Sequence, residues 1–130
     1  MANIIIVEDD FKVADIYKKR LEEDGHKVEI IDDTGALDKI KSQKPDVVLL
    51  DLLMPKISGM TILRELKSDP NFEEIPVLIL TNVEGTNELS QAIALGACAY
   101  LVKAETNIDI LSAKVKEVIE SEAIATGVKS

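Results

Sequence analysis

Short apolar runs alternate along this chain with longer stretches in which apolar side chains recur every three or four positions. The apolar runs cover residues 4–7, 28–31, 47–50, 77–80 and 100–102, and the amphipathic stretches cover about 11–24, 35–43, 59–68, 87–95 and 108–122. A strand-like pattern that alternates in this way with a helix-like one is typical of repeated βα units. The pattern therefore predicts an α/β fold with a parallel sheet.

The spacing within three amphipathic stretches predicts which side chains face the core. They are Val13, Ile16, Tyr17 and Leu21 in the first helix, Leu89, Ile93 and Leu95 in the fourth, and Ile108, Leu111, Val115, Val118 and Ile119 in the last. Thr106 and Asp109 have the spacing of a capping box at the start of the last helix.

The composition of the apolar runs ranks the predicted strands by burial. The runs at 4–7, 47–50 and 77–80 are apolar at every position, as expected of strands that helices cover on both faces. The run at 28–31 is interrupted by a glutamate and the run at 100–102 is short, so both are expected at the edges of the sheet. With right-handed crossovers, this ranking predicts a doubly wound, five-stranded parallel sheet in the order 2-1-3-4-5.

Acidic residues follow the two strands between which this strand order reverses. Glu8, Asp9 and Asp10 come after the first run, and Asp51 comes after the third. In open α/β sheets the ligand crevice lies at the carboxyl ends of the strands at such a reversal. Taken singly, Asp10 fits the N-cap of the first helix and Asp51 fits a turn. Taken together, these residues predict a functional site.

Carboxylates at the ends of adjacent strands repel one another. At about 5 Å and an effective dielectric constant near 20, the repulsion is roughly 3 kcal/mol for each ionised pair. A divalent cation removes this conflict, and a set of oxygen ligands without His or Cys favours Mg²⁺ or Mn²⁺. Two further strand ends supply Thr81 and Lys103. A carboxylate beside a cation, a hydroxyl and a lysine is suited to phosphoryl transfer.

Length, charge and cysteine content restrict the class of protein. The chain has 130 residues, 46% of them hydrophobic and 30% charged, which fits one globular domain. We expect this domain to cover 1–124 and a frayed tail to cover 125–130. The formal charge of -9 disfavours direct binding to nucleic acid.

The sequence contains neither an apolar run long enough to span a bilayer nor the pattern of a signal peptide. We therefore expect a cytoplasmic location without membrane insertion. Cys98 is predicted to be a buried, reduced thiol.

Four short motifs lie at the strand ends just described. They are Val7-Glu-Asp-Asp10, Leu49-Leu-Asp-Leu-Leu-Met-Pro-Lys-Ile-Ser-Gly59, Leu80-Thr81 and Tyr100-Leu-Val-Lys103. In this order they resemble the receiver domain of bacterial two-component response regulators, over residues 3 to about 122, and the chain is similar to the single-domain response regulator of chemotaxis. The resemblance implies the flavodoxin-like receiver fold.

The resemblance also implies a phosphoacceptor and its metal site. Asp51 would accept a phosphoryl group from a histidine kinase or a histidine phosphotransfer protein, in a reaction that depends on Mg²⁺. Asp9 would bind the ion directly and Glu8 mainly through water, and the backbone carbonyl of Leu53 would complete the site. The chain would then be a signalling phosphoprotein that promotes its own phosphorylation and dephosphorylation rather than an enzyme.

Three further residues acquire roles from the same resemblance. Thr81 would hydrogen-bond the phosphoryl group, and Lys103 would pair with it. Movement of Thr81 would let the ring of Tyr100 turn inward and alter a surface that contacts a downstream protein target or a second copy of the chain.

The sequence departs from the receiver pattern at a few positions. Ala104 follows the lysine where receivers usually have a proline in a cis bond, Asn82 is larger than the usual residue after the threonine, and Leu53 is apolar where many receivers are polar. The departure at Ala104 leaves open the alternative of a receiver-like interaction scaffold that is not phosphorylated. A phosphatase of the haloacid dehalogenase type is disfavoured because it requires a second aspartate at position 53, and a flavin-binding protein because the acidic run would repel its phosphate.

Overall fold

The computed structural model describes residues 2–32, 34–52, 58–82 and 87–125, and the strands and α-helices within them are those that the sequence predicts. The strands are β1 (Asn3–Val7), β2 (Lys27–Ile31), β3 (Val47–Asp51), β4 (Val77–Thr81) and β5 (Ala99–Val102). The helices are α1 (Phe11–Glu23), α2 (Ala36–Gln43), α3 (Gly59–Ser68), α4 (Asn87–Leu95) and α5 (Ile108–Ala125), with a 3₁₀ turn η1 (Lys103–Glu105) before α5. The largest difference from the predicted bounds is at the end of α5, which runs on to Ala125.

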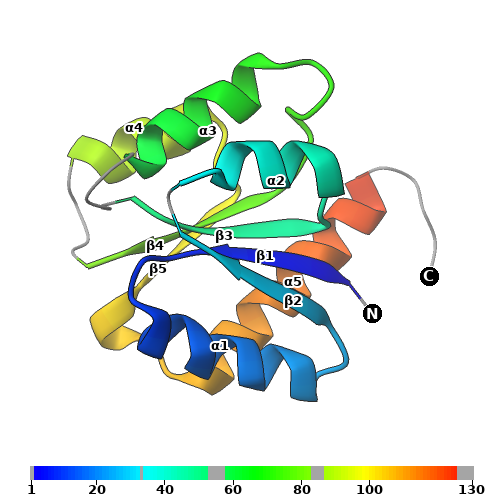
Figure 1. Cartoon of the computed structure of the whole chain (residues 1–130), viewed down its shortest axis with the longest axis vertical. Coiled ribbons are helices and arrows are strands. Elements are labelled where there is room, and N and C mark those ends of the chain that lie inside the picture. Colours follow the sequence, from blue (N-terminus) through cyan, green and yellow to red (C-terminus); the bar gives the residue numbers. More distant parts are fainter. Residues whose placement is uncertain (1, 33, 53–57, 83–86, 126–130) are drawn as a thin grey trace.

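The strands form one parallel sheet in the order β2-β1-β3-β4-β5, which confirms the predicted topology. Helices α1 and α5 cover one face of the sheet, and α2, α3 and α4 cover the other (Figure 1). The fold is therefore the doubly wound, flavodoxin-like arrangement, and its strand order reverses between β1 and β3.

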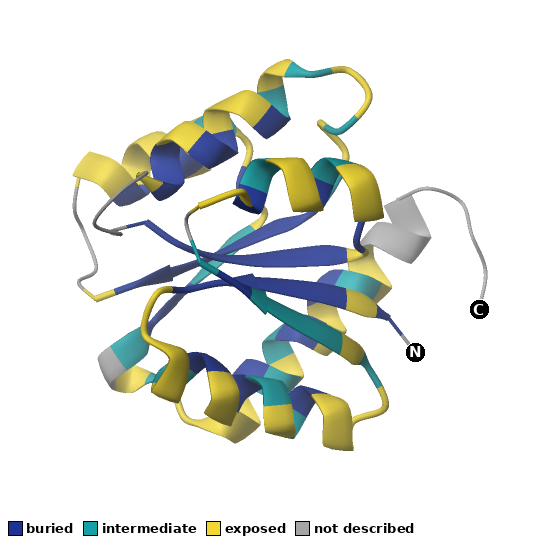
Figure 2. Ribbon diagram, in the orientation of Figure 1, coloured by how far each residue is buried: buried dark blue, intermediate teal, exposed yellow. Residues whose placement is uncertain are grey.

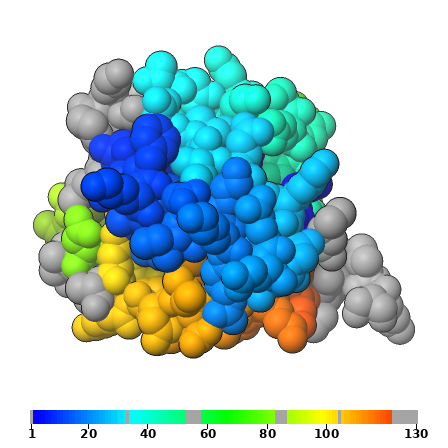
Figure 3. Space-filling model, turned by 60° about the horizontal axis from the view of Figure 1, so that its bottom comes forward, coloured from blue at the N-terminus to red at the C-terminus, as the bar shows by residue number. Residues whose placement is uncertain are grey.

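Burial follows the ranking that the apolar runs predict. Every residue of β3 and β4 is buried, as are the last four residues of β1, whereas most of edge strand β2 is only half-buried. Figure 2 shows this as a dark centre of the sheet beside a lighter β2. Side chains alternate between two apolar clusters, one on each face, because successive residues of a strand point in opposite directions. One cluster packs under α2–α4 and the other under α1 and α5, which lie side by side (Figure 3).

Three isoleucines predicted to face the core are exposed instead. The exposed fractions are 55% for Ile16, 43% for Ile93 and 40% for Ile108. Ile16 and Ile93 each adjoin a buried helical residue, Tyr17 and Ala92, and adjacent residues of an α-helix are turned by about 100° from one another. The buried faces of α1 and α4 are therefore narrower than the apolar pattern indicates.

Helix capping agrees with the sequence at α1 and differs from it at α5. Asp10 is the N-cap of α1, where its Oδ1 accepts hydrogen bonds from the backbone N–H groups of Lys12 and Val13. At α5 the predicted capping box is wrong, because the side chain of Asn107 accepts from the N–H of Ile110. The hydroxyl of Thr106 instead donates to the carbonyl of Val102.

The thiol of Cys98 also differs from its prediction. Cys98 is exposed, although its Sγ donates to the carbonyl of Val77 at 3.3 Å. It lies between Ala97, which is buried, and Ala99 at the start of β5. The peptide bond between Lys103 and Ala104 is trans, like the other described peptide bonds.

Candidate functional site

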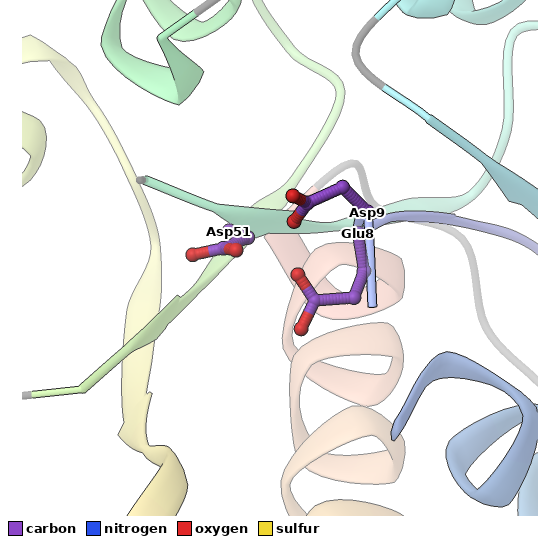
Figure 4. Close-up of side chains that lie close together, drawn as sticks. All are labelled: Glu8, Asp9 and Asp51. Carbon is purple, nitrogen blue, oxygen red and sulfur yellow. The ribbon is translucent and has the colours of Figure 1, made fainter. Parts of the chain in front are cut away.

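Three carboxylates meet at the carboxyl ends of β1 and β3. Glu8 and Asp9 directly follow β1, and Asp51 is the last residue of β3. The register of these neighbouring strands pairs Val7 with Leu50, so the residues that come next stand side by side. One oxygen of each carboxylate lies within 4.8 Å of the others, and Figure 4 shows the three side chains gathered at one place. The structure thus brings together the acidic residues that the sequence singles out.

Two of the three carboxylates are removed from solvent. Glu8 is 1% exposed and Asp51 is 4% exposed, whereas Asp9 lies open to solvent. Burial, together with the neighbouring carboxylate of Asp51, raises the pKa of Glu8 to about 7, although Lys103 opposes the rise. The Oε2 atom of Glu8 is buried and accepts no hydrogen bond from the described part of the chain. Such an atom is costly unless a further donor or a cation reaches it.

Lys103 supplies positive charge to this cluster from the end of the edge strand β5. Its Nζ donates to Glu8 Oε1 at 2.6 Å and lies 3.3 Å from Asp51 Oδ2. Burial alone would lower the pKa of Lys103, but the bond to Glu8 and the charge of Asp51 outweigh it and raise that pKa. Lys103 directly follows β5, so its long side chain spans β4 to reach Asp51.

Thr81, Asn82 and Tyr100, which lie at or near this edge of the sheet, differ in how far they are buried. Thr81 is the buried last residue of β4 and pairs in register with Val102, one residue before Lys103. Asn82 is exposed and lines the cleft described below. Tyr100 is half-buried and packs against the apolar cluster under α2–α4.

The sequence also singles out Asp10 and Leu53. Asp10 lies beside the acidic cluster without belonging to it, because its carboxylate caps α1. Leu53, whose backbone carbonyl is a predicted metal ligand, lies outside the described residues.

A cleft of about 530 Å³ opens over the carboxylates. Besides the three acids and Lys103, its lining comprises Asp10, Val13, Tyr17 and Asn82. The salt bridges of Lys103 therefore leave room for a ligand next to Asp51. The sequence pattern assigns Tyr17 to a packing face and does not indicate its place in the cleft. The sequence feature that points to the cleft is a phenol on an otherwise apolar helix face, eight residues after Asp9.

The acidic cluster suits a small divalent cation. All of its side-chain donors are oxygens, and neither a His nor a Cys belongs to the cluster among the described residues. The unsatisfied Oε2 of Glu8 and the mutual repulsion of the carboxylates are both relieved by such an ion. Hard oxygen donors with space for water favour Mg²⁺ over zinc.

A glycine keeps α3 close to the end of β3. The N–H of Gly59 donates to the carbonyl of Leu52 at 3.0 Å. A Cβ atom on Gly59 would lie 2.2 Å from the backbone oxygen of Asp51 and 2.8 Å from the Cα of Leu52. Only glycine fits so close an approach, and it supports the backbone that carries Asp51.

Comparison with known proteins assigns the chain to a family. The model of the response regulator receiver domain matches residues 4–116. The response regulator MprA of Mycolicibacterium vanbaalenii is 36% identical over 101 residues, which are 77% of this chain and 43% of MprA. The chain thus spans less than half the length of this relative.

Solved structures show the same fold. A CheY-like response regulator receiver domain protein from Methanospirillum hungatei superposes with a TM-score of 0.86 at 26% identity, covering 96% of this chain and 98% of that one. The signal receiver domain of a DNA binding response regulator from Colwellia psychrerythraea has a TM-score of 0.82 at 33% identity, covering 91% and 98%. Among the described helices, none has the length and apolar character needed to cross a membrane.

Proposed function

The chain belongs to the response regulator receiver domain family, and we propose that it accepts a phosphoryl group on Asp51 from a histidine kinase or a histidine phosphotransfer protein. The observation that carries the proposal is the arrangement at the carboxyl edge of the sheet. A buried carboxylate lies there beside two other carboxylates and 3.3 Å from a lysine, under a cleft with room for a phosphoryl group.

In the proposed reaction an oxygen of the Asp51 carboxylate attacks the phosphorus of a phosphohistidine. The new bond is an acyl phosphate, the phosphorus–nitrogen bond breaks, and its electron pair stays on the imidazole, which is released after taking a proton from solvent. Lys103 lies close enough to Asp51 to neutralise charge on the transferred group, and Thr81 supplies a hydroxyl from the adjacent strand.

The proposed cation is Mg²⁺, with Mn²⁺ as a substitute. Glu8, Asp9 and Asp51 would hold it, together with the backbone carbonyl of Leu53. A bound Mg²⁺ neutralises the developing charge on the phosphoryl oxygens. Among the chain's own residues, Lys103 offsets the carboxylate charge, because its ammonium lies 2.6 Å from Glu8 Oε1 and 3.3 Å from Asp51 Oδ2.

The output proposed for this receiver unit, residues 1–124, is a change of protein contact. Thr81 shifts toward the phosphoryl group, and Tyr100 follows into the space that Thr81 leaves. The half-buried position of Tyr100 supports this role, since a ring that is neither fixed in the core nor free in solvent can adopt two arrangements. The contact would be with a downstream protein or with a second copy of the chain, and the acidic charge of -9 argues against direct contact with nucleic acid.

Intact mass after treatment with acetyl phosphate tests the proposal. We expect one phosphoryl group to be incorporated in the presence of Mg²⁺, and none with EDTA or in the Asp51→Ala variant. Asp38→Ala removes an exposed carboxylate on α2 and is the matched control, so it should label like the parent protein. Undiminished incorporation in Asp51→Ala would refute the assignment. Absence of incorporation in the parent protein would favour the unphosphorylated scaffold.

A further inference from the structure

Tyr17 contributes a hydroxyl to a helix face that is otherwise apolar. The buried residues of α1 are Ala14, Tyr17 and Leu21, and Tyr17 is 7% exposed. Its ring belongs to the apolar cluster under α1 and α5. An apolar side chain would serve this packing equally well, and the phenol oxygen is not one of the described buried side-chain atoms that lack a hydrogen-bond partner. The phenol therefore calls for an explanation beyond packing.

The cleft provides polar neighbours for this hydroxyl. Tyr17 lines the same hollow as Glu8, Asp51 and Lys103. Burial raises the pKa of the Tyr17 phenol, the ammonium of Lys103 opposes the rise, and the two carboxylates add to it. The phenol thus lies within electrostatic reach of the acceptor carboxylate and of its lysine. A phenol oxygen accepts as well as donates hydrogen bonds, so it can serve an ammonium group.

Lys103 has to change partners if the proposed function is right. Its ammonium donates to Glu8 Oε1 at 2.6 Å and lies 3.3 Å from Asp51 Oδ2. If the carboxylate oxygens of Glu8 and Asp51 bind a cation, they accept less well from the ammonium of Lys103. The side chain of Lys103 is mostly buried, since only 17% of it is exposed, so solvent does not readily replace them. An acceptor on the wall of the cleft would then direct the ammonium.

We propose that Tyr17 is a positioning residue for Lys103: its hydroxyl accepts a hydrogen bond from the ammonium and keeps it aimed at Asp51 when Glu8 is engaged by the cation. This inference rests on the proposed phosphoacceptor function. It makes α1, which follows the acidic run, a second support of the lysine, in addition to the turn after β5 from which the lysine extends.

Two substitutions at Tyr17 separate the hydroxyl from the ring. Tyr17→Phe keeps the ring and removes the hydroxyl, and Tyr17→Leu removes both. We expect each to lower the rate of Mg²⁺-dependent phosphorylation by acetyl phosphate roughly ten- to a hundredfold, the range for one hydrogen bond to a charged group. Urea unfolding of each variant shows whether the fold is retained. A parental rate in Tyr17→Phe would overturn the proposal, because the ring alone would then suffice.

A double-mutant cycle tests whether Tyr17 acts through Lys103. In the Lys103→Met background, Tyr17→Phe should cause no further loss of rate, because the ammonium that the hydroxyl positions is absent. Losses that multiply independently would overturn the proposal. The proposed function fails in a different way, since the parent protein would then show no incorporation that depends on Asp51.

Discussion

Replacing Glu8 by glutamine is expected to remove a pH dependence of the free energy of unfolding. The pKa of Glu8 is about 7 in the fold, against an ordinary value of 4.5, with burial as the main cause. This difference corresponds to at most about 3 kcal/mol. Because the pKa is raised, the folded chain holds the proton more tightly than the unfolded chain does. The resulting stabilisation is complete below pH 4.5 and is lost as the pH rises through 7.

The assay is urea unfolding, followed by far-ultraviolet circular dichroism, of the parent protein and of Glu8→Gln between pH 5 and pH 8 with EDTA. The amide has nearly the shape of the carboxyl group but does not titrate in this range. The difference in unfolding free energy, variant minus parent, should therefore rise with pH by up to about 3 kcal/mol. Burial lowers the pKa of His26, which makes stability rise with pH, but His26 is common to both proteins and cancels in the difference.

Magnesium provides a second arm of the same experiment. A cation competes with the proton on Glu8, so Mg²⁺ should stabilise the parent protein more at pH 8 than at pH 5.5. Glu8→Gln should gain less from Mg²⁺ at the higher pH. Parallel stability curves for the two proteins in EDTA would refute the reasoning, because Glu8 would then titrate alike in the folded and unfolded chains.

Two further substitutions test the supports of the site. Gly59→Ala places a Cβ 2.2 Å from the backbone oxygen of Asp51, which cannot move aside like a flexible side chain. The free energy of unfolding, measured with denaturant, should therefore fall by an amount near the upper end of about 1–3 kcal/mol, and labelling by acetyl phosphate should slow. Parental values of both quantities would contradict the close approach. Asp10→Ala removes the N-cap of α1 and should cost about 1 kcal/mol in the same assay, while labelling stays near the parental rate. A labelling loss as large as that of Asp9→Ala would instead make Asp10 a fourth carboxylate ligand.

The placement of the acidic residues could be read from the sequence because it depends on local pattern and on simple topology. Apolar runs that are uninterrupted by charge belong in the centre of a parallel sheet, and the residues after them come to one edge. Glu8, Asp9 and Asp51 therefore meet where the strand order predicts. The N-cap of Asp10 is equally local, since its partners are two and three residues away.

The tertiary structure decided which apolar helical residues are covered and which partners the charged side chains have. Periodicity alone does not limit the width of a buried face, so the pattern predicts Ile16 and Ile93 in the core although the structure leaves them exposed. The bond between Lys103 and Glu8 joins residues 95 positions apart, and no local pattern encodes its length or the unsatisfied oxygen beside it. The place of Tyr17 in the cleft likewise depends on how α1 packs against the sheet. The sequence indicates which face of α1 is buried, but it does not indicate which residues of other elements the side chains on that face meet.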